Sequence, residues 1–197
     1  MIENGLMQAE PSAINVSPYT TNSSKLFVGL KNGKVLVVSN ADTTGQWTEI
    51  TGSNFVGSVS DIEFGETEND IFVTMHNYGV ENIWYSSNGG TSWVSKEGDF
   101  PDIPIKTILQ NPLNTEEVIV GTDIGVWKTS NFSAAAPNWT QSYNGMSNVP
   151  VLDLDLRDDN TVFAATYGRG VFSGTFTSDT ATIKEVAEDG SDTQKED

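Results

Sequence analysis

A repeat of about 46 residues constrains this chain more than any other feature of its sequence. Three tryptophans, Trp47, Trp93 and Trp139, are separated by 46 and 46 residues. A second series keeps the same step, and each member opens a run of alternating apolar residues: Val59, Ile105 and Val151. A third series consists of glycines at Gly33, Gly79, Gly125 and Gly170. Three series in phase indicate one structural unit repeated along the chain.

Within each period the sequence is strand-like. Four short segments alternate β-branched or aromatic residues with polar ones, and turn residues separate them; in the second period they are residues 59–64, 71–76, 82–86 and 93–96. Four strands in about 46 residues is typical of a β-propeller blade. The repeated glycine falls between the second and third segments, where a tight hairpin favours positive φ. We therefore predict an all-β fold of about four blades, each of four antiparallel strands.

The phase of the repeat predicts an incomplete ring. Glu185 stands near the place where a fourth tryptophan is expected, so the last blade should lack its outer strand. Residues 1–10 would be the remnant of a preceding outer strand and loop, and residues 11–177 would form the blades. Residues 178–197 hold seven acidic residues and two lysines, which is typical of a disordered acidic tail.

Two interpretations of this phase stay open. The chain is either a four-bladed protein with weak closure or, as we favour, the C-terminal portion of a ring of seven or eight blades. Both leave strand edges and blade faces uncovered. We therefore expect self-association or pairing with the missing blades.

Composition excludes several classes of function. The chain has 27 acidic and 10 basic residues and a net charge of −17, which argues against nucleic acid as a partner. No apolar run is long enough to insert into a membrane, and residues 1–20 show no signal-peptide pattern. There is no cysteine and only one histidine, His76, so we expect neither a metal site nor a cofactor.

One segment carries a family resemblance. Residues 86–93 read SSNGGTSW and resemble the Asp-box, S-x-D-x-G-x-x-W, of BNR-repeat propellers, with Asn88 where Asp is usual. Looser copies occur at residues 39–47 and 129–139. Residues 121–127 and 165–172 are similar to segments of sortilin-type and xyloglucanase-like propellers, and the whole is most similar to secreted BNR-containing proteins of Bacteroidetes labelled glycosyl hydrolase. The resemblance implies a BNR-type propeller within a longer exported protein, located extracellularly or at the cell surface.

An enzymatic function would require more than the fold. A sialidase needs an arginine cluster, but the chain has only Arg157 and Arg169. An inverting glycosidase needs two carboxylates across a cleft. The resemblance to xyloglucanase-like propellers makes Asp123 the alternative catalytic candidate, but no second matching segment is visible. Asp61, Asp153 and Asp155, at alternating positions of inner strands, are expected to face the channel or bond turns. The main interpretation assigns no catalytic residue.

The remaining candidate is a binding surface. In a propeller the hairpins between the second and third strands share one face with the loops that join successive blades. The candidate binding residues on this face are His76, Tyr78, Asp123, Tyr167 and Arg169, with Phe55 and Phe100 beside them. Aromatic rings beside polar groups suit contact with a sugar or peptide. We therefore expect a non-catalytic binding or display module for a glycan or protein ligand; the alternative is a fragment of a glycoside hydrolase with paired carboxylates.

Overall fold

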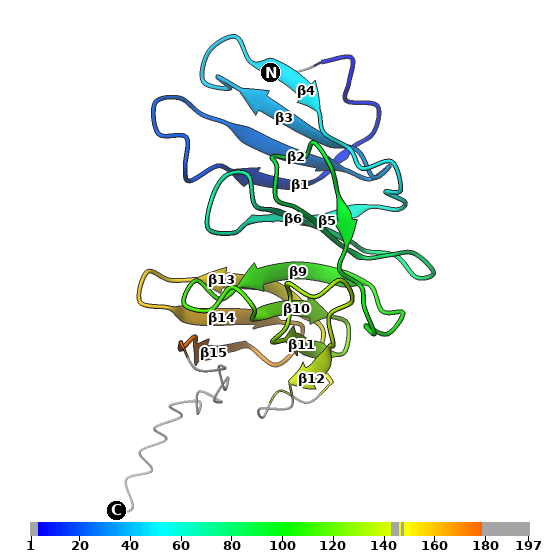
Figure 1. Cartoon of the computed structure of the whole chain (residues 1–197), viewed down its shortest axis with the longest axis vertical. Coiled ribbons are helices and arrows are strands. Elements are labelled where there is room, and N and C mark those ends of the chain that lie inside the picture. The colour runs from blue at the N-terminus through cyan, green and yellow to red at the C-terminus, as the bar shows by residue number, and fades with distance from the viewer. Residues whose placement is uncertain (1–3, 143–145, 147, 179–197) are drawn as a thin grey trace, which may run out of the picture.

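The computed structural model describes residues 4–142, 146 and 148–178, and the regular structure of these residues is entirely β-strand (Figure 1). Most of the predicted acidic tail and the first three residues of the predicted N-terminal remnant lie outside the described residues. The strands form four separate antiparallel sheets, which we call blades I to IV in chain order.

The strand bounds follow the predicted repeat. Blade I contains β1 (Pro11–Val16), β2 (Leu26–Leu30), β3 (Val35–Ser39) and β4 (Gln46–Glu49). Blade II contains β5 (Val59–Phe64), β6 (Ile71–Met75), β7 (Ile83–Ser86) and β8 (Val94–Ser95). Blade III contains β9 (Ile105–Gln110), β10 (Val118–Thr122), β11 (Gly125–Thr129) and β12 (Thr140–Ser142). Blade IV contains β13 (Val151–Leu156), β14 (Thr161–Thr166) and β15 (Val171–Thr175).

Each strand pairs with its neighbour in sequence, so every blade is an antiparallel meander. Blades I to III have four strands and blade IV has three within the described residues, which confirms the predicted propeller blades and the missing outer strand. The repeated glycines lie at the hairpins between second and third strands with φ between 71° and 104°, as their spacing predicted. A side chain would be strained at such an angle.

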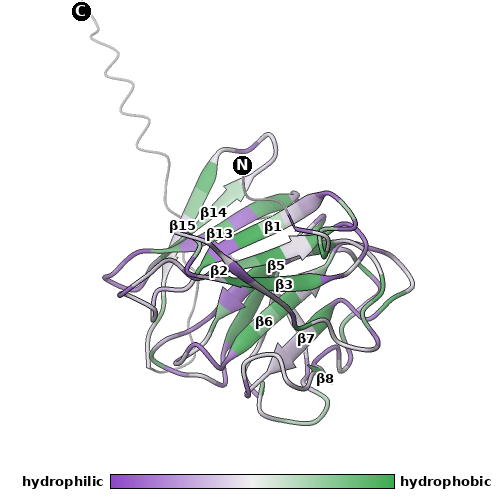
Figure 2. Ribbon diagram, turned by 90° about the horizontal axis from the view of Figure 1, so that it is seen from above, coloured by the Kyte–Doolittle hydropathy of each residue, from purple (hydrophilic) through white to green (hydrophobic). Residues whose placement is uncertain are grey.

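Neighbouring blades pack face to face, and their first strands lie side by side. Strand β1 lies beside β5, β5 beside β9, and β9 beside β13, whereas no comparable contact returns from β13 to β1 in the described part of the chain. Three apolar clusters fill the boundaries between successive blades. Strands β3 and β6 are accordingly apolar along most of their length (Figure 2). A fourth cluster lies on blade I, where Leu30 and Leu36 are covered by residues that include Leu6. The core is therefore divided among several clusters rather than gathered in one place.

The repeated tryptophans connect successive blades. The Trp93 indole N–H donates to the carbonyl of Ile50, which directly follows β4, at 2.7 Å. The Trp139 indole N–H donates in the same way to the carbonyl of Lys96, after β8, at 3.1 Å. Each tryptophan thus ties the outer strand of its own blade to the end of the preceding blade.

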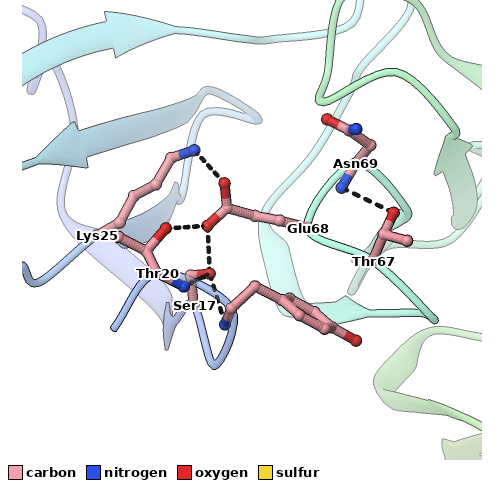
Figure 3. Close-up of polar contacts among 7 residues, drawn as sticks. Ser17, Thr20, Lys25, Thr67, Glu68 and Asn69 are labelled. Atoms are coloured by element: carbon pink, nitrogen blue, oxygen red, sulfur yellow. Dashed lines mark hydrogen bonds and ion pairs between the residues drawn. The ribbon is translucent and has the colours of Figure 1, made fainter. Parts of the chain in front are cut away.

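The boundary between blades I and II also has a polar network (Figure 3). The Glu68 carboxylate accepts hydrogen bonds from the hydroxyls of Ser17 and Thr20 and pairs with the Lys25 ammonium at 2.6 Å. Burial alone would raise the pKa of Glu68, but the bonds from Lys25, Ser17 and Thr20 outweigh it and hold the pKa below its usual value. This network therefore favours the packed arrangement above the usual Glu pKa and weakens as the pH falls through the lowered one.

Candidate functional site

A β-bulge at the start of every inner strand shapes the channel mouth. The pairing register shifts around Ser12, Ser60, Lys106 and Leu152, the second residues of β1, β5, β9 and β13. A bulge re-aims the side chain that it carries. Together with Ser58, Val59 and His76, these residues line a shallow concavity of about 300 Å³. All four blades therefore contribute to one surface, which we call the mouth.

An ion pair lies at the mouth. The Lys106 ammonium pairs with the Asp123 carboxylate of the β10–β11 hairpin, and the side chains are 19% and 37% exposed. Because the charges neutralise one another, Asp123 presents a fixed, directional acceptor rather than an isolated anion. Sequence reasoning selected Asp123 and missed Lys106. The period gives Lys106 the same place in the repeat as Ser60 and Leu152, 46 residues away on either side, but it does not reveal the bulge that turns the side chain to the mouth.

His76 lines the concavity, as expected for a mouth residue. Its Nδ1 lies 3.2 Å from the carbonyl oxygen of Ile105 in the next blade. Because a carbonyl only accepts, Nδ1 carries the proton of this bond. Its backbone N–H donates to the carbonyl of Ser58 at 2.9 Å. The ring is therefore held in place and its Nε2 is available to a ligand.

The two predicted tyrosines project from the hairpins around the mouth. Tyr78 on the β6–β7 hairpin is 67% exposed, and Tyr167 on the β14–β15 hairpin is 73% exposed. The Gly79 N–H donates to Asp102 at 2.6 Å, and the Tyr167 N–H donates to the carbonyl of Pro150 at 2.8 Å. Both hairpins are thus anchored at their backbones while the aromatic rings remain exposed.

The structure separates the predicted residues into two groups. His76 lines the concavity, and Asp123 is joined to it through Lys106. Tyr78, Tyr167 and the exposed Arg169 do not line it and lie on the hairpins instead.

Two other aromatic residues expected at this face pack against tryptophans, and Phe55 is half-buried whereas Phe100 is buried. Phe55 packs on Trp84 and Trp93 with ring centroids 5.1 and 5.0 Å apart. Phe100 is 7% exposed and packs on Trp127 and Trp139 at 5.5 and 5.6 Å. The expectation that Phe100 contributes to the binding surface was therefore wrong, because these loops fold back on the tryptophans of their own blades.

Four further acidic side chains lie along the inner strands. The Asp61 carboxylate accepts the N–H of Ile62 at 2.8 Å and that of Ile108 in blade III at 2.9 Å. Burial raises the pKa of Asp61 to about 6, although the Ile108 bond opposes it. Burial and the neighbouring Asp61 raise the pKa of Glu63 to about 7. Asp153 and Asp155 accept the N–H of the next residue at 3.0 Å each, so these acids bond backbone groups.

A second hollow of about 530 Å³ lies at the other end of the inner strands, lined by Glu63 and Asp155 among others. A search of the described residues for three or more His, Asp or Glu side chains close enough to hold a metal ion found none. Among those residues there is also no helix of the length and apolarity needed to span a membrane.

Comparison with solved structures supports the fold. A computationally designed protein called Ika4 is 18% identical with a TM-score of 0.57, over 86% of this chain and 93% of that one. An ancestral GH74 enzyme is 16% identical with a TM-score of 0.63, over 90% of this chain but 23% of the enzyme. The Niastella koreensis GH74 enzyme is 14% identical with a TM-score of 0.57, over 84% and 28%.

These similarities, all below 25% identity, show the β-propeller fold alone. This chain spans only about a quarter of the length of either GH74 enzyme. No family model matches the chain, and no curated protein matches it.

Proposed function

We propose that this chain is a non-catalytic binding module of the BNR-repeat propeller type, which contacts a glycan or protein ligand through the mouth. The observation that carries the proposal is the pair of exposed tyrosines, Tyr78 and Tyr167, on hairpins whose backbones are anchored. Rigid aromatic side chains lose little conformational entropy on binding.

A neutral glycan fits the chemistry of the mouth best. Aromatic faces can cover the apolar face of a sugar ring, while His76, Ser60 and the Lys106–Asp123 pair offer directional partners for hydroxyl groups. The net charge of −17 would repel a polyanionic glycan, particularly at low salt. We therefore expect neutral polysaccharides to be preferred to acidic ones.

The BNR assignment and an extracellular or cell-surface location form part of the same proposal. Ser86 and Asn88 support it, since their side chains bond the hairpin that they open. The Gly90 N–H donates to the Ser86 hydroxyl at 2.9 Å, and the Ser92 N–H donates to the Asn88 amide oxygen at 2.9 Å. This is the role expected of an Asp-box turn.

Hydrolysis of a glycan is the second candidate, because two GH74 enzymes share the fold. The mouth offers weaker support for it. Asp123 is paired with Lys106, and no carboxylate belongs to the described residues that line the concavity. An inverting glycosidase would need a second carboxylate roughly 6.5–9.5 Å away. Release of reducing ends from xyloglucan that Asp123→Asn abolishes would favour the hydrolase.

Affinity electrophoresis tests the binding function directly. In native gels containing xyloglucan or mixed-linkage β-glucan, we expect the chain to migrate more slowly than in a plain gel. The double variant Tyr78→Ala/Tyr167→Ala should lose this retardation and keep its circular dichroism spectrum.

Tyr19→Ala is the matched control, since Tyr19 is also exposed, at 44%, but lines the hollow at the other end of the inner strands. Retardation of the double variant equal to that of the parent would remove the proposed role of the tyrosines. No retardation by either polysaccharide would remove these two glycans as ligands.

A further inference from the structure

Each end blade leaves apolar residues uncovered. In blade IV they lie on the side away from blade III, whereas in blade I they lie on β1 alone, because Leu30 and Leu36 of β2 and β3 are buried under residues that include Leu6. We call the exposed flank of β1, with Ile14 and Val16, the leading face. We call the exposed flank of blade IV, with Asp153, Phe163 and Val171, the trailing face.

The leading face lacks a preceding blade. The residue two positions past the bulge is 1% exposed at Ile62, 0% at Ile108 and 5% at Leu154, because each packs against the blade before it. The equivalent Ile14 is 67% exposed, and Val16, farther along the same strand, is 55% exposed. Apolar side chains that are core in three blades are thus uncovered in blade I.

The trailing face lacks a following blade. In blades I to III, one position near the start of the third strand packs against the next blade. Its residues are Val35, Ile83 and Val126, which are 0%, 0% and 1% exposed. Val171 occupies the same position in blade IV and is 64% exposed. Phe163 on β14 is only half-buried, with the Arg157 guanidinium 5.5 Å from its ring centroid.

A polar contact shows the same incompleteness. The Asp61 carboxylate accepts the Ile108 N–H of the next blade at 2.9 Å, and the Thr107 hydroxyl accepts the Leu154 N–H at 3.3 Å. Asp153 holds the equivalent position. One of its carboxylate oxygens takes the adjacent Leu154 N–H, as Asp61 takes that of Ile62. The second carboxylate oxygen of Asp61 accepts the Ile108 N–H of the next inner strand. Among the described residues, the second carboxylate oxygen of Asp153 has no such hydrogen bond to a following inner strand.

We propose that a second copy of this chain covers both faces. The trailing face of each copy packs on the leading face of the other, so two identical boundaries close a ring of eight blades. At each boundary Val171 packs against Ile14 of the second copy, and Asp153 accepts the backbone N–H of that Ile14. A blade boundary of this kind already occurs three times within the chain, and the same chain carries both of its halves.

The arrangement of the blades favours closure by two copies. One copy does not cover its own faces, since no contact like those between neighbouring inner strands joins β13 to β1 among the described residues. A head-to-tail contact produces either a closed ring or an open filament. The bulges of all four inner strands line one concavity, so the blades turn about a common axis, as a ring requires.

Light scattering after size exclusion tests the proposal on the full 197-residue chain. We expect twice the chain mass of 21.3 kDa. Ile14→Asp breaks the leading face and Val171→Asp breaks the trailing face, so each variant alone should be monomeric. Their equimolar mixture should regain the dimer, because one of its two boundaries is intact. Leu113→Asp is the control: Leu113 is 48% exposed but lies on neither face, and this variant should remain dimeric.

Other outcomes would overturn the proposal. A monomeric parent at every concentration would mean that a second copy does not cover these faces, leaving blades of a longer chain as the occupant. A ladder of growing masses would contradict closure. A dimer that only one of the two variants disrupts would indicate pairing of like faces. None of these results depends on the ligand of the mouth.

The polar contact has its own test. Asp153→Ala should weaken dimerisation by about a hundredfold, because each dimer loses two hydrogen bonds to a charged group, one at each boundary and each worth about tenfold. Asp155→Ala is the control, since Asp155 also accepts the N–H of its neighbour but lines the hollow at the other end of the inner strands. Equal dissociation constants for the two variants would remove Asp153 from the boundary.

Discussion

Blades II and IV contain the same repeat but have different surroundings. Blade II packs between two blades, and its apolar residues join the clusters on both sides. Among the described residues, blade IV packs against blade III alone (Figure 1). Its Val171 and Tyr167 are exposed. Equivalent positions are therefore core in one blade and surface in the other.

This difference teaches that burial in a repeat protein depends on the neighbouring unit as much as on the residue itself. A repeat cannot bury its own face, and stacking of repeats supplies the missing partner.

Removing apolar bulk should separate the two blades most clearly. Ile83→Ala should lower the free energy of unfolding by about 2–5 kcal/mol, because Ile83 is fully buried between blades II and III. The equivalent Val171→Ala should change it by only about 0.5 kcal/mol or less. Urea unfolding in an Ile14→Asp background, which prevents the proposed pairing, gives both values. Similar losses would show that the trailing face is already covered within one copy.

Asp61 should make the stability of the fold depend on pH. The pKa of Asp61 is raised to about 6, so its protonated form favours the folded state and this stabilisation is lost as the pH rises through that value. Asp61→Asn should remove this loss, roughly 1–2 kcal/mol between about pH 4 and pH 8. Asp153→Asn in an Ile14→Asp background, which prevents the proposed pairing, is the control, because it makes the same substitution on the next inner strand but one and leaves Asp61 unchanged. Urea unfolding across this range checks both; equal slopes in the parent and Asp61→Asn would contradict the assignment.

The tryptophan link should give the smallest difference. Trp93→Phe removes the indole N–H that bonds the Ile50 carbonyl across the boundary between blades I and II. Trp127→Phe removes a buried indole N–H that has no hydrogen-bond partner. Both substitutions remove the same volume, so Trp93→Phe should cost about 1 kcal/mol more. Thermal unfolding of the two variants measures this difference, and equal melting temperatures would mean that the bond contributes nothing.

The sequence predicted correctly those features that depend on local residue patterns or on the period of the repeat. The strands of blade II lie within a residue or two of the predicted segments, and the repeated glycines have the positive φ expected of hairpins. The candidate site was harder to predict. The sequence selected His76 and Asp123, but Lys106 emerged only when the bulge in β9 turned its side chain to the mouth. A bulge depends on the partner strand, which residue spacing does not reveal.

The sequence by itself determined the blade as a unit, its four strands, its hairpins and the missing strand of the last blade, because these follow from side-chain alternation, turn residues and the period. Only the tertiary structure decided which copy of each repeated residue is buried. Ile14 and Ile62 occupy the same place in the repeat, yet one is 67% exposed and the other 1%. The physical reason is that a blade buries its face only against another blade, so exposure at the ends depends on what stands beside them.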